Sequence, residues 1–98
     1  MAISSYAIHC YRPGCHNLAV YKIAARWSDG HTEELKTYAL SCPDCLPYWF
    51  GLSREKQAAC RLAAGETLER PGIYHLERGA RDRGLQRLVD LERQLAGA

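Results

Sequence analysis

Two pairs of cysteines are the sequence feature that most restricts how this chain can fold. One pair lies in CYRPGC (residues 10–15) and the other in SCPDC (residues 41–45). Tetrahedral Zn²⁺ is commonly held by thiolate or imidazole ligands that come in such sequence-local pairs. His9 and His16 flank the first pair, and either could replace a cysteine. The pattern predicts a structural Zn²⁺ site with four ligands: Cys10, Cys15, Cys42 and Cys45.

The segment between the two pairs predicts how they meet. Strand-like runs lie on both sides of the DG dipeptide at residues 29–30, which is typical of a two-residue β-hairpin turn. With that turn, Arg26 would pair with Glu33, and Asn17 would lie opposite Cys42. Closing the hairpin would therefore bring the two cysteine pairs together.

Helical segments are expected after the second cysteine pair, and Pro47 suits the first turn of one that begins directly after Cys45. Residues 54–64 follow Ser53, a suitable N-cap, and precede Gly65, a residue type that often ends helices. Cys60 lies within this segment and is expected to be buried as a small apolar residue. Residues 80–96 are expected to form an amphipathic helix with four leucines on one face: Leu85, Leu88, Leu91 and Leu95.

The length of 98 residues leaves room for one small α+β domain with a thin hydrophobic core. A structural Zn²⁺ contributes on the order of 10 kcal/mol to the folding of small zinc domains, so the metal would supply much of the stability. We expect residues 1–65 to form a zinc-binding knuckle, hairpin and helix. Residues 66–98 would add a connector, a short strand and the C-terminal helix, packed on or extending the same domain.

The order of these elements resembles the treble-clef class of zinc fingers. In that class a knuckle carries the first two ligands, a β-hairpin follows, and the last two ligands lie at the start of a helix. The matching segments here are CYRPGC, the hairpin around DG, and CPDCLP, so the resemblance covers about residues 8–64. The resemblance implies this fold but no single activity, because treble clefs include nucleic-acid binders, protein-interaction modules and some nucleases.

Charge and motif content narrow the range of functions. The formal net charge is +2, and a Zn²⁺ held by four thiolates would bring the folded protein close to neutral, which weakens the argument for a polyanionic partner. The sequence shows no leader and no long apolar run, so we expect a cytoplasmic protein with no membrane contact. No catalytic triad, phosphate loop or paired-carboxylate motif stands out. We therefore expect a protein that is not an enzyme and has no small-molecule substrate.

Three functional hypotheses remain. The leading one is a protein-interaction module that binds another protein or forms a homodimer. The last is a thiol redox protein that uses the CPDC pair, because a helix N-terminus lowers thiol pKa values. The second, which ranks before it, is a nucleic-acid-binding zinc finger that would use two groups of side chains. Its basic group would be Arg78, Arg81, Arg83 and Arg87, and its stacking group Tyr48, Trp49 and Phe50. The same aromatics could instead form a buried lid over the metal site.

Overall fold

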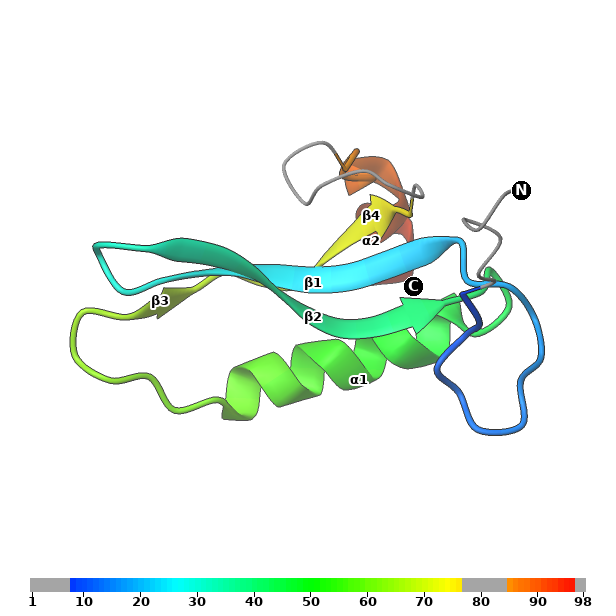
Figure 1. Ribbon diagram of the computed structural model, residues 1–98, viewed down its shortest axis with the longest axis horizontal. Coiled ribbons are helices and arrows are strands. Elements are labelled where there is room, and N and C mark those ends of the chain that lie inside the picture. The colour runs from blue at the N-terminus through cyan, green and yellow to red at the C-terminus, as the bar shows by residue number, and fades with distance from the viewer. Residues whose placement is uncertain (1–7, 77–84, 97–98) are drawn as a thin grey trace, which may run out of the picture.

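The computed structural model describes residues 8–76 and 85–96. It is a small α+β structure, with an antiparallel β-sheet and two helices, as the sequence predicted (Figure 1). The elements follow one another as β1 (Tyr21–Ser28), β2 (Glu33–Ser41), α1 (Leu46–Ala59), β3 (Thr67–Leu68), β4 (Gly72–His75) and α2 (Val89–Ala96). Strand β1 is central, because β2 pairs with one of its edges while β3 and β4 pair with the other.

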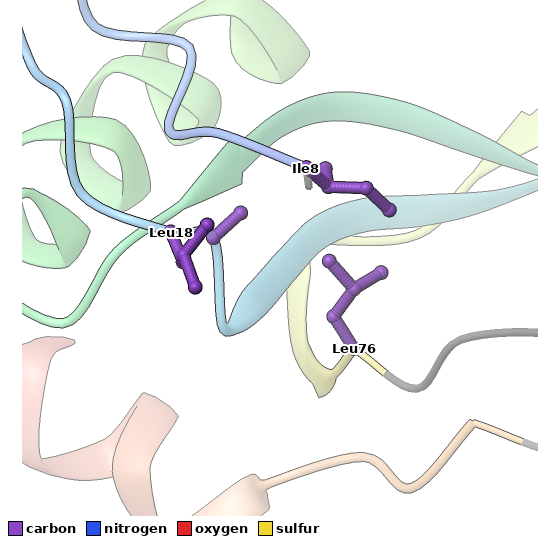
Figure 2. Close-up of a pocket in the computed structure, with 4 residues that line it drawn as sticks. Ile8, Leu18 and Leu76 are labelled. Atoms are coloured by element: carbon purple, nitrogen blue, oxygen red, sulfur yellow. The ribbon is translucent and has the colours of Figure 1, made fainter. Parts of the chain in front are cut away.

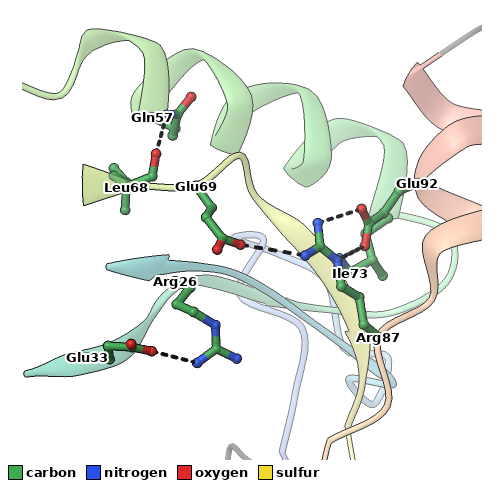
Figure 3. A network of polar contacts seen from close by, with 8 residues as sticks. All are labelled: Arg26, Glu33, Gln57, Leu68, Glu69, Ile73, Arg87 and Glu92. Carbon is green, nitrogen blue, oxygen red and sulfur yellow. Dashed lines mark hydrogen bonds and ion pairs between the residues drawn. The ribbon is translucent and has the colours of Figure 1, made fainter. Parts of the chain in front are cut away.

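The hairpin of β1 and β2 forms, but its predicted two-residue turn is wrong. The connection is a four-residue loop in which the Asp29 carboxylate accepts hydrogen bonds from the backbone N–H groups of His31 (2.8 Å) and Thr32 (2.7 Å). These bonds stabilise a wider loop than the DG dipeptide alone would require. As a result Arg26 pairs with Leu35 rather than with Glu33, although its side chain still reaches the Glu33 carboxylate at 3.6 Å (Figure 3).

A second departure lies in the middle of the hairpin. The register shifts between Ile23 and Ala24, so that Ala24 pairs with Thr37 and Ile23 pairs with Ala39. Tyr38 is the extra residue on β2, which is the signature of a β-bulge. The bulge changes which residues meet at the end of the hairpin that carries the cysteines.

Helix α1 begins directly after the second cysteine pair, as Pro47 predicted, but it continues through Ser53, where a second helix start was expected, and ends earlier than residue 64. It starts directly after Cys45, with Pro47 in its first turn, where the missing proline N–H costs no hydrogen bond. Ser53 is therefore buried in the helix interior and is not an N-cap. The helix ends at Ala59, and Cys60 directly after it is exposed, so the predicted burial of this thiol is wrong. Gly65 instead provides a positive φ of 86° in a later turn.

The C-terminal part of the chain completes the sheet. Strand β4 pairs with β1 and places Ile73 opposite Ile23. The predicted long helix is wrong in its first part, because Arg87 forms a bridge with Tyr74 and helix α2 covers only Val89–Ala96. Residues 80–84 of that prediction lie outside the described residues.

The hydrophobic core lies between the sheet and the helices. Its buried members come from β1, α1 and β4, and they are Ile23, Leu46, Phe50 and Ile73. Three of the four leucines in the predicted stripe pack against it: Leu88, Leu91 and Leu95. Such a small core is consistent with the expectation that a domain of this size needs a further source of stability.

An ion pair between Arg87 and Glu92, together with a backbone hydrogen bond, holds α2 against β4 (Figure 3). Arg87 donates hydrogen bonds from Nε and Nη2 to the two carboxylate oxygens of Glu92 at 2.9 and 3.0 Å. Glu92 also accepts a hydrogen bond from the backbone N–H of Ile73 at 2.9 Å. The Arg87 guanidinium lies against Gly72, where an added Cβ would approach Arg87 Nε to 2.7 Å. Gly72 therefore leaves the space that the guanidinium occupies.

Candidate metal centre

The first cysteine pair lies in a loop that backbone hydrogen bonds fasten to the hairpin. Cys10 N–H donates to the Asn17 carbonyl at 3.0 Å, which closes the loop on itself. Within the loop Cys15 N–H donates to the Arg12 carbonyl at 3.0 Å, and Gly14 supplies the positive φ of 83° that this turn needs. Tyr11 N–H donates to the Leu40 carbonyl of β2 at 2.9 Å, so the loop is held beside the second pair.

The second pair occupies the junction between β2 and α1. Cys42 follows the last residue of the strand, and Cys45 is the N-cap residue of the helix. A tight connection through Pro43 places both thiols on the same side, where Leu46 N–H donates to the Pro43 carbonyl at 3.4 Å. The strand and the helix therefore fix the direction from which each sulfur enters the site.

The four cysteines form one cluster. Their Sγ atoms all lie within 4.8 Å of one another. The Sγ of Cys15 is 3.7 Å from that of Cys42 and 3.9 Å from that of Cys45. A tetrahedral Zn²⁺ with Zn–S bonds of about 2.3 Å would separate its sulfur ligands by about 3.8 Å. The spacing therefore fits ligation of a single ion, whereas a disulfide would need about 2.05 Å.

Burial separates one cysteine from the other three. Cys10, Cys42 and Cys45 are 6%, 0% and 7% exposed, whereas Cys15 is only half-buried. Solvent therefore reaches the cluster from the side of Cys15. A thiol of a second protein could not approach Cys42 without opening the fold.

The thiols do not ionise alike. Burial disfavours the Cys10 thiolate, but backbone hydrogen bonds from Arg12 and Cys42 outweigh this effect and lower its pKa to about 6. Burial and hydrogen bonding to the neighbouring thiols instead raise the pKa of Cys45 to about 12. Four thiolates packed this closely repel one another, and a divalent cation at their centre removes that repulsion.

Two neighbouring side chains also favour the thiolate forms of the cysteines. The Asn17 side-chain amide donates a hydrogen bond to Cys42 Sγ at 3.6 Å, and after the opposing effect of burial it is the main cause of the lowered pKa of Cys42. The Arg12 side chain also favours the Cys45 thiolate, although burial dominates there. The predicted pairing of Asn17 with Cys42 in the hairpin is wrong, because β1 begins at Tyr21, which pairs with Ser41; Asn17 reaches Cys42 through its side chain, and this role was missed. A polar amide in a loop gives no sequence signal for such a bond.

Neither histidine beside the first pair joins the cluster. Within the described part of the chain, the group of side chains placed to hold a metal ion consists of the four cysteines. His9 and His16 are both exposed. The donor set is therefore all sulfur, which suits Zn²⁺ or iron rather than Mg²⁺ or Ca²⁺.

The three consecutive aromatics have three different environments. Phe50 is buried in the hydrophobic core, and Trp49 is half-buried between that core and the cysteine cluster. Tyr48 is 47% exposed, and the Arg12 guanidinium lies 4.2 Å from the centre of its ring. The interpretation as a buried lid therefore fits Phe50 and Trp49. The interpretation as an exposed binding surface fits only Tyr48, which faces solvent.

The predicted basic cluster is only partly described. Arg78, Arg81 and Arg83 lie outside the described residues. Arg87 is held by Glu92 and lies 3.9 Å from a Glu69 carboxylate oxygen (Figure 3). The Arg87 guanidinium is therefore already paired with carboxylates of its own chain.

A small apolar hollow lies near the cysteine end of the sheet. It measures about 120 Å³ and is lined by Ile8, Leu18, Ala19 and Leu76 (Figure 2). All four side chains are aliphatic, so the hollow offers no acid, base or nucleophile. Among the described residues, no helix has both the length and the apolar character needed to cross a bilayer.

Comparisons with known proteins return nothing similar to this chain. No protein-family model matches it, and no match is found among curated proteins or solved structures. Inferences about function therefore depend on the residues and geometry of the chain itself.

Proposed function

We propose that this chain is a small zinc-binding protein of treble-clef type that acts as an interaction module for another protein or for its own copy. Two sulfur–sulfur distances carry the metal-binding part of the proposal, because 3.7 and 3.9 Å agree with the tetrahedral value of about 3.8 Å. The order of loop, hairpin and helix supports the treble-clef assignment, with Cys45 at the start of the helix.

The metal would have a structural role in this proposal. Four cysteines complete a tetrahedral shell, whereas catalytic zinc sites keep a position open for water or substrate. The burial of Cys42 and Cys45 argues against thiol exchange with a protein substrate. When bound, the ion would cross-link the loop that carries Cys10 and Cys15 to the junction between β2 and α1.

Exposed apolar side chains near the cysteines support an interaction role. Three of the large apolar residues that the structure leaves exposed lie in the sequence next to the ligands: Tyr11, Leu18 and Tyr48. Tyrosines in such positions combine a large contact area with a polar hydroxyl, which suits protein interfaces.

Metal analysis tests the central part of this proposal. Protein purified under reducing conditions should contain one metal ion per chain by native mass spectrometry, and elemental analysis should identify it as zinc. Iron in equal amount would keep the four-cysteine site but contradict the zinc assignment. Metal-free protein that stays folded in the presence of chelator would refute the structural role.

A second candidate function is the binding of single-stranded nucleic acid. The observation that favours it is the stacking of Arg12 on the exposed ring of Tyr48, because bases stack well on both side chains. Titration of mixed-sequence oligonucleotides at several salt concentrations distinguishes the candidates. Binding that weakens steeply with salt and is lost in Tyr48→Ala would favour nucleic acid over a protein partner.

A further inference from the structure

The outer edge of β2 carries a short stretch of backbone that no described residue pairs with. Tyr11 bonds to this edge at Leu40, beyond the bulge. The stretch 33–37 lies before the bulge and after the loop that follows β1. Its residues are exposed except for Leu35, which is half-buried. An exposed strand edge is a template for pairing with another strand.

The direction of the backbone groups on this edge follows from the bonds inside the sheet. In an antiparallel pair, residues alternate between positions bonded to the partner and positions that are not. Glu69 N–H donates to the Arg26 carbonyl at 3.0 Å, so the backbone of Arg26 faces β3 and not β2. Leu35 is the partner of Arg26 on β2. The N–H and C=O of Leu35 therefore point outward, and by alternation so do those of Glu33 and Thr37.

We propose that this edge pairs with the same edge of a second copy of the chain, antiparallel about a two-fold axis at Leu35. Leu35 would then bond to the partner's Leu35, and Glu33 would bond to the partner's Thr37 in both directions. The sheet would continue across the dimer. This proposal deepens the interaction role proposed above by naming its partner, and it does not depend on the identity of the metal.

The sequence of the edge selects this register over its neighbours. A two-fold axis at Glu34 would place two glutamates face to face, and an axis at Lys36 would do the same with two lysines. An axis at Leu35 instead places Glu34 opposite the partner's Lys36, twice. These are the positions not joined by backbone bonds across the new interface, where Cα atoms approach to about 4.5 Å and side chains meet most closely. Charges that would repel in the other registers attract in this one.

Within its own chain, the Lys36 ammonium contacts Trp27 of the neighbouring strand β1. Its Nζ lies 4.9 Å from the centre of the Trp27 ring, and Trp27 is the cross-strand partner of Glu34. Lys36 and Glu34 thus lie on the same face of the sheet.

Because the paired stretch is short, we expect weak association, with a dissociation constant on the order of micromolar or higher.

Charge exchange tests the proposal by sedimentation over a wide range of protein concentrations. The unmodified protein should show a monomer–dimer equilibrium. Glu34→Lys and Lys36→Glu should each weaken the dimer about tenfold or more, because both symmetric pairs become repulsive. The double variant Glu34→Lys/Lys36→Glu should recover it. A mixture of the two single variants should form a heterodimer, since every cross-strand pair is then attractive.

Two further variants separate this interface from other effects. Glu55→Lys reverses a charge on the exposed surface of α1 and should leave the dimer unchanged. Leu35→Pro removes an outward N–H that bonds to none of the described residues, and it should abolish the dimer while retaining metal and the circular dichroism of the folded state. A protein that is monomeric at all concentrations, or a dimer insensitive to both charge reversals, would overturn the proposal. Metal content measured in the same samples tests the zinc site separately.

Discussion

Replacement of Cys42 by serine should weaken metal binding strongly and lower the stability that depends on the metal. Cys42 is fully buried and its Sγ lies 3.7 Å from that of Cys15, so no other side chain can take its place without rearrangement. Cys60 provides a matched control. It is exposed, lies at the opposite end of α1 from Cys45, and does not belong to the cluster.

The expected loss of stability is large because the hydrophobic core is small. Full burial of the four apolar core side chains contributes about 6–12 kcal/mol. A structural Zn²⁺ contributes about 10–16 kcal/mol, or about 2.5–4 kcal/mol for each of four ligands if they share it equally. Loss of one ligand should therefore weaken metal binding roughly a hundredfold to a thousandfold. For a domain of this size the melting temperature should fall by at least about 10 °C.

The assay combines native mass spectrometry with thermal unfolding followed by circular dichroism in reducing buffer. Cys60→Ser should retain one metal ion and melt like the unmodified protein. Cys42→Ser should hold less metal than Cys60→Ser, give it up at lower chelator concentrations and melt earlier. If Cys42→Ser keeps a full complement of metal and melts with Cys60→Ser, the four-cysteine site is wrong.

Three other changes test individual contacts. Asn17→Leu removes the hydrogen bond to Cys42 Sγ and should weaken metal binding roughly tenfold in a chelator competition, while an unchanged affinity would show that the amide has no role. Gly72→Ala should displace the Arg87 guanidinium and lower the unfolding free energy by about 1 kcal/mol, and a denaturation midpoint at or above the original would contradict this. Backbone hydrogen bonds from Thr32 and His31 lower the pKa of Asp29, so its stabilisation is present above the unfolded-state pKa and is lost as pH falls through the lower folded-state pKa. Amide exchange in the loop, corrected for its intrinsic pH dependence, should therefore accelerate below about pH 4, and Asp29→Asn should remove that pH dependence.

The sequence predicted which cysteines cluster more accurately than it predicted the strand pairing that brings them together. Local spacing identifies the pairs, and a hairpin between them is enough to bring them together whatever its register. The register itself depends on the Asp29 carboxylate, which stabilises a four-residue loop, and on the bulge at Tyr38. Both are outcomes of competing hydrogen bonds that a turn dipeptide does not encode.

Tertiary packing explains the errors in the helices. Ser53 has the chemistry of an N-cap, but the helix had already begun after Cys45, and the serine became an interior residue. Leu88 has helical spacing with Leu91 and Leu95, yet its backbone N–H donates to the Ile73 carbonyl at 2.7 Å. Pairing with β4 thus delays the start of α2. Periodicity alone cannot distinguish a leucine that packs from a helix from one that packs from an extended segment.

The position of Trp49 links the metal centre to the hydrophobic core. Its ring packs against the cysteine cluster on one side and against the apolar cluster on the other. Thermodynamic linkage is reciprocal, so metal binding that stabilises the core must itself be weakened when the core is loosened. A conservative change such as Ile73→Val, which touches no ligand, should then reduce metal affinity in a competition assay. Through Trp49, the affinity for a bound metal ion would then measure how well the core that includes Ile73 of β4 is packed.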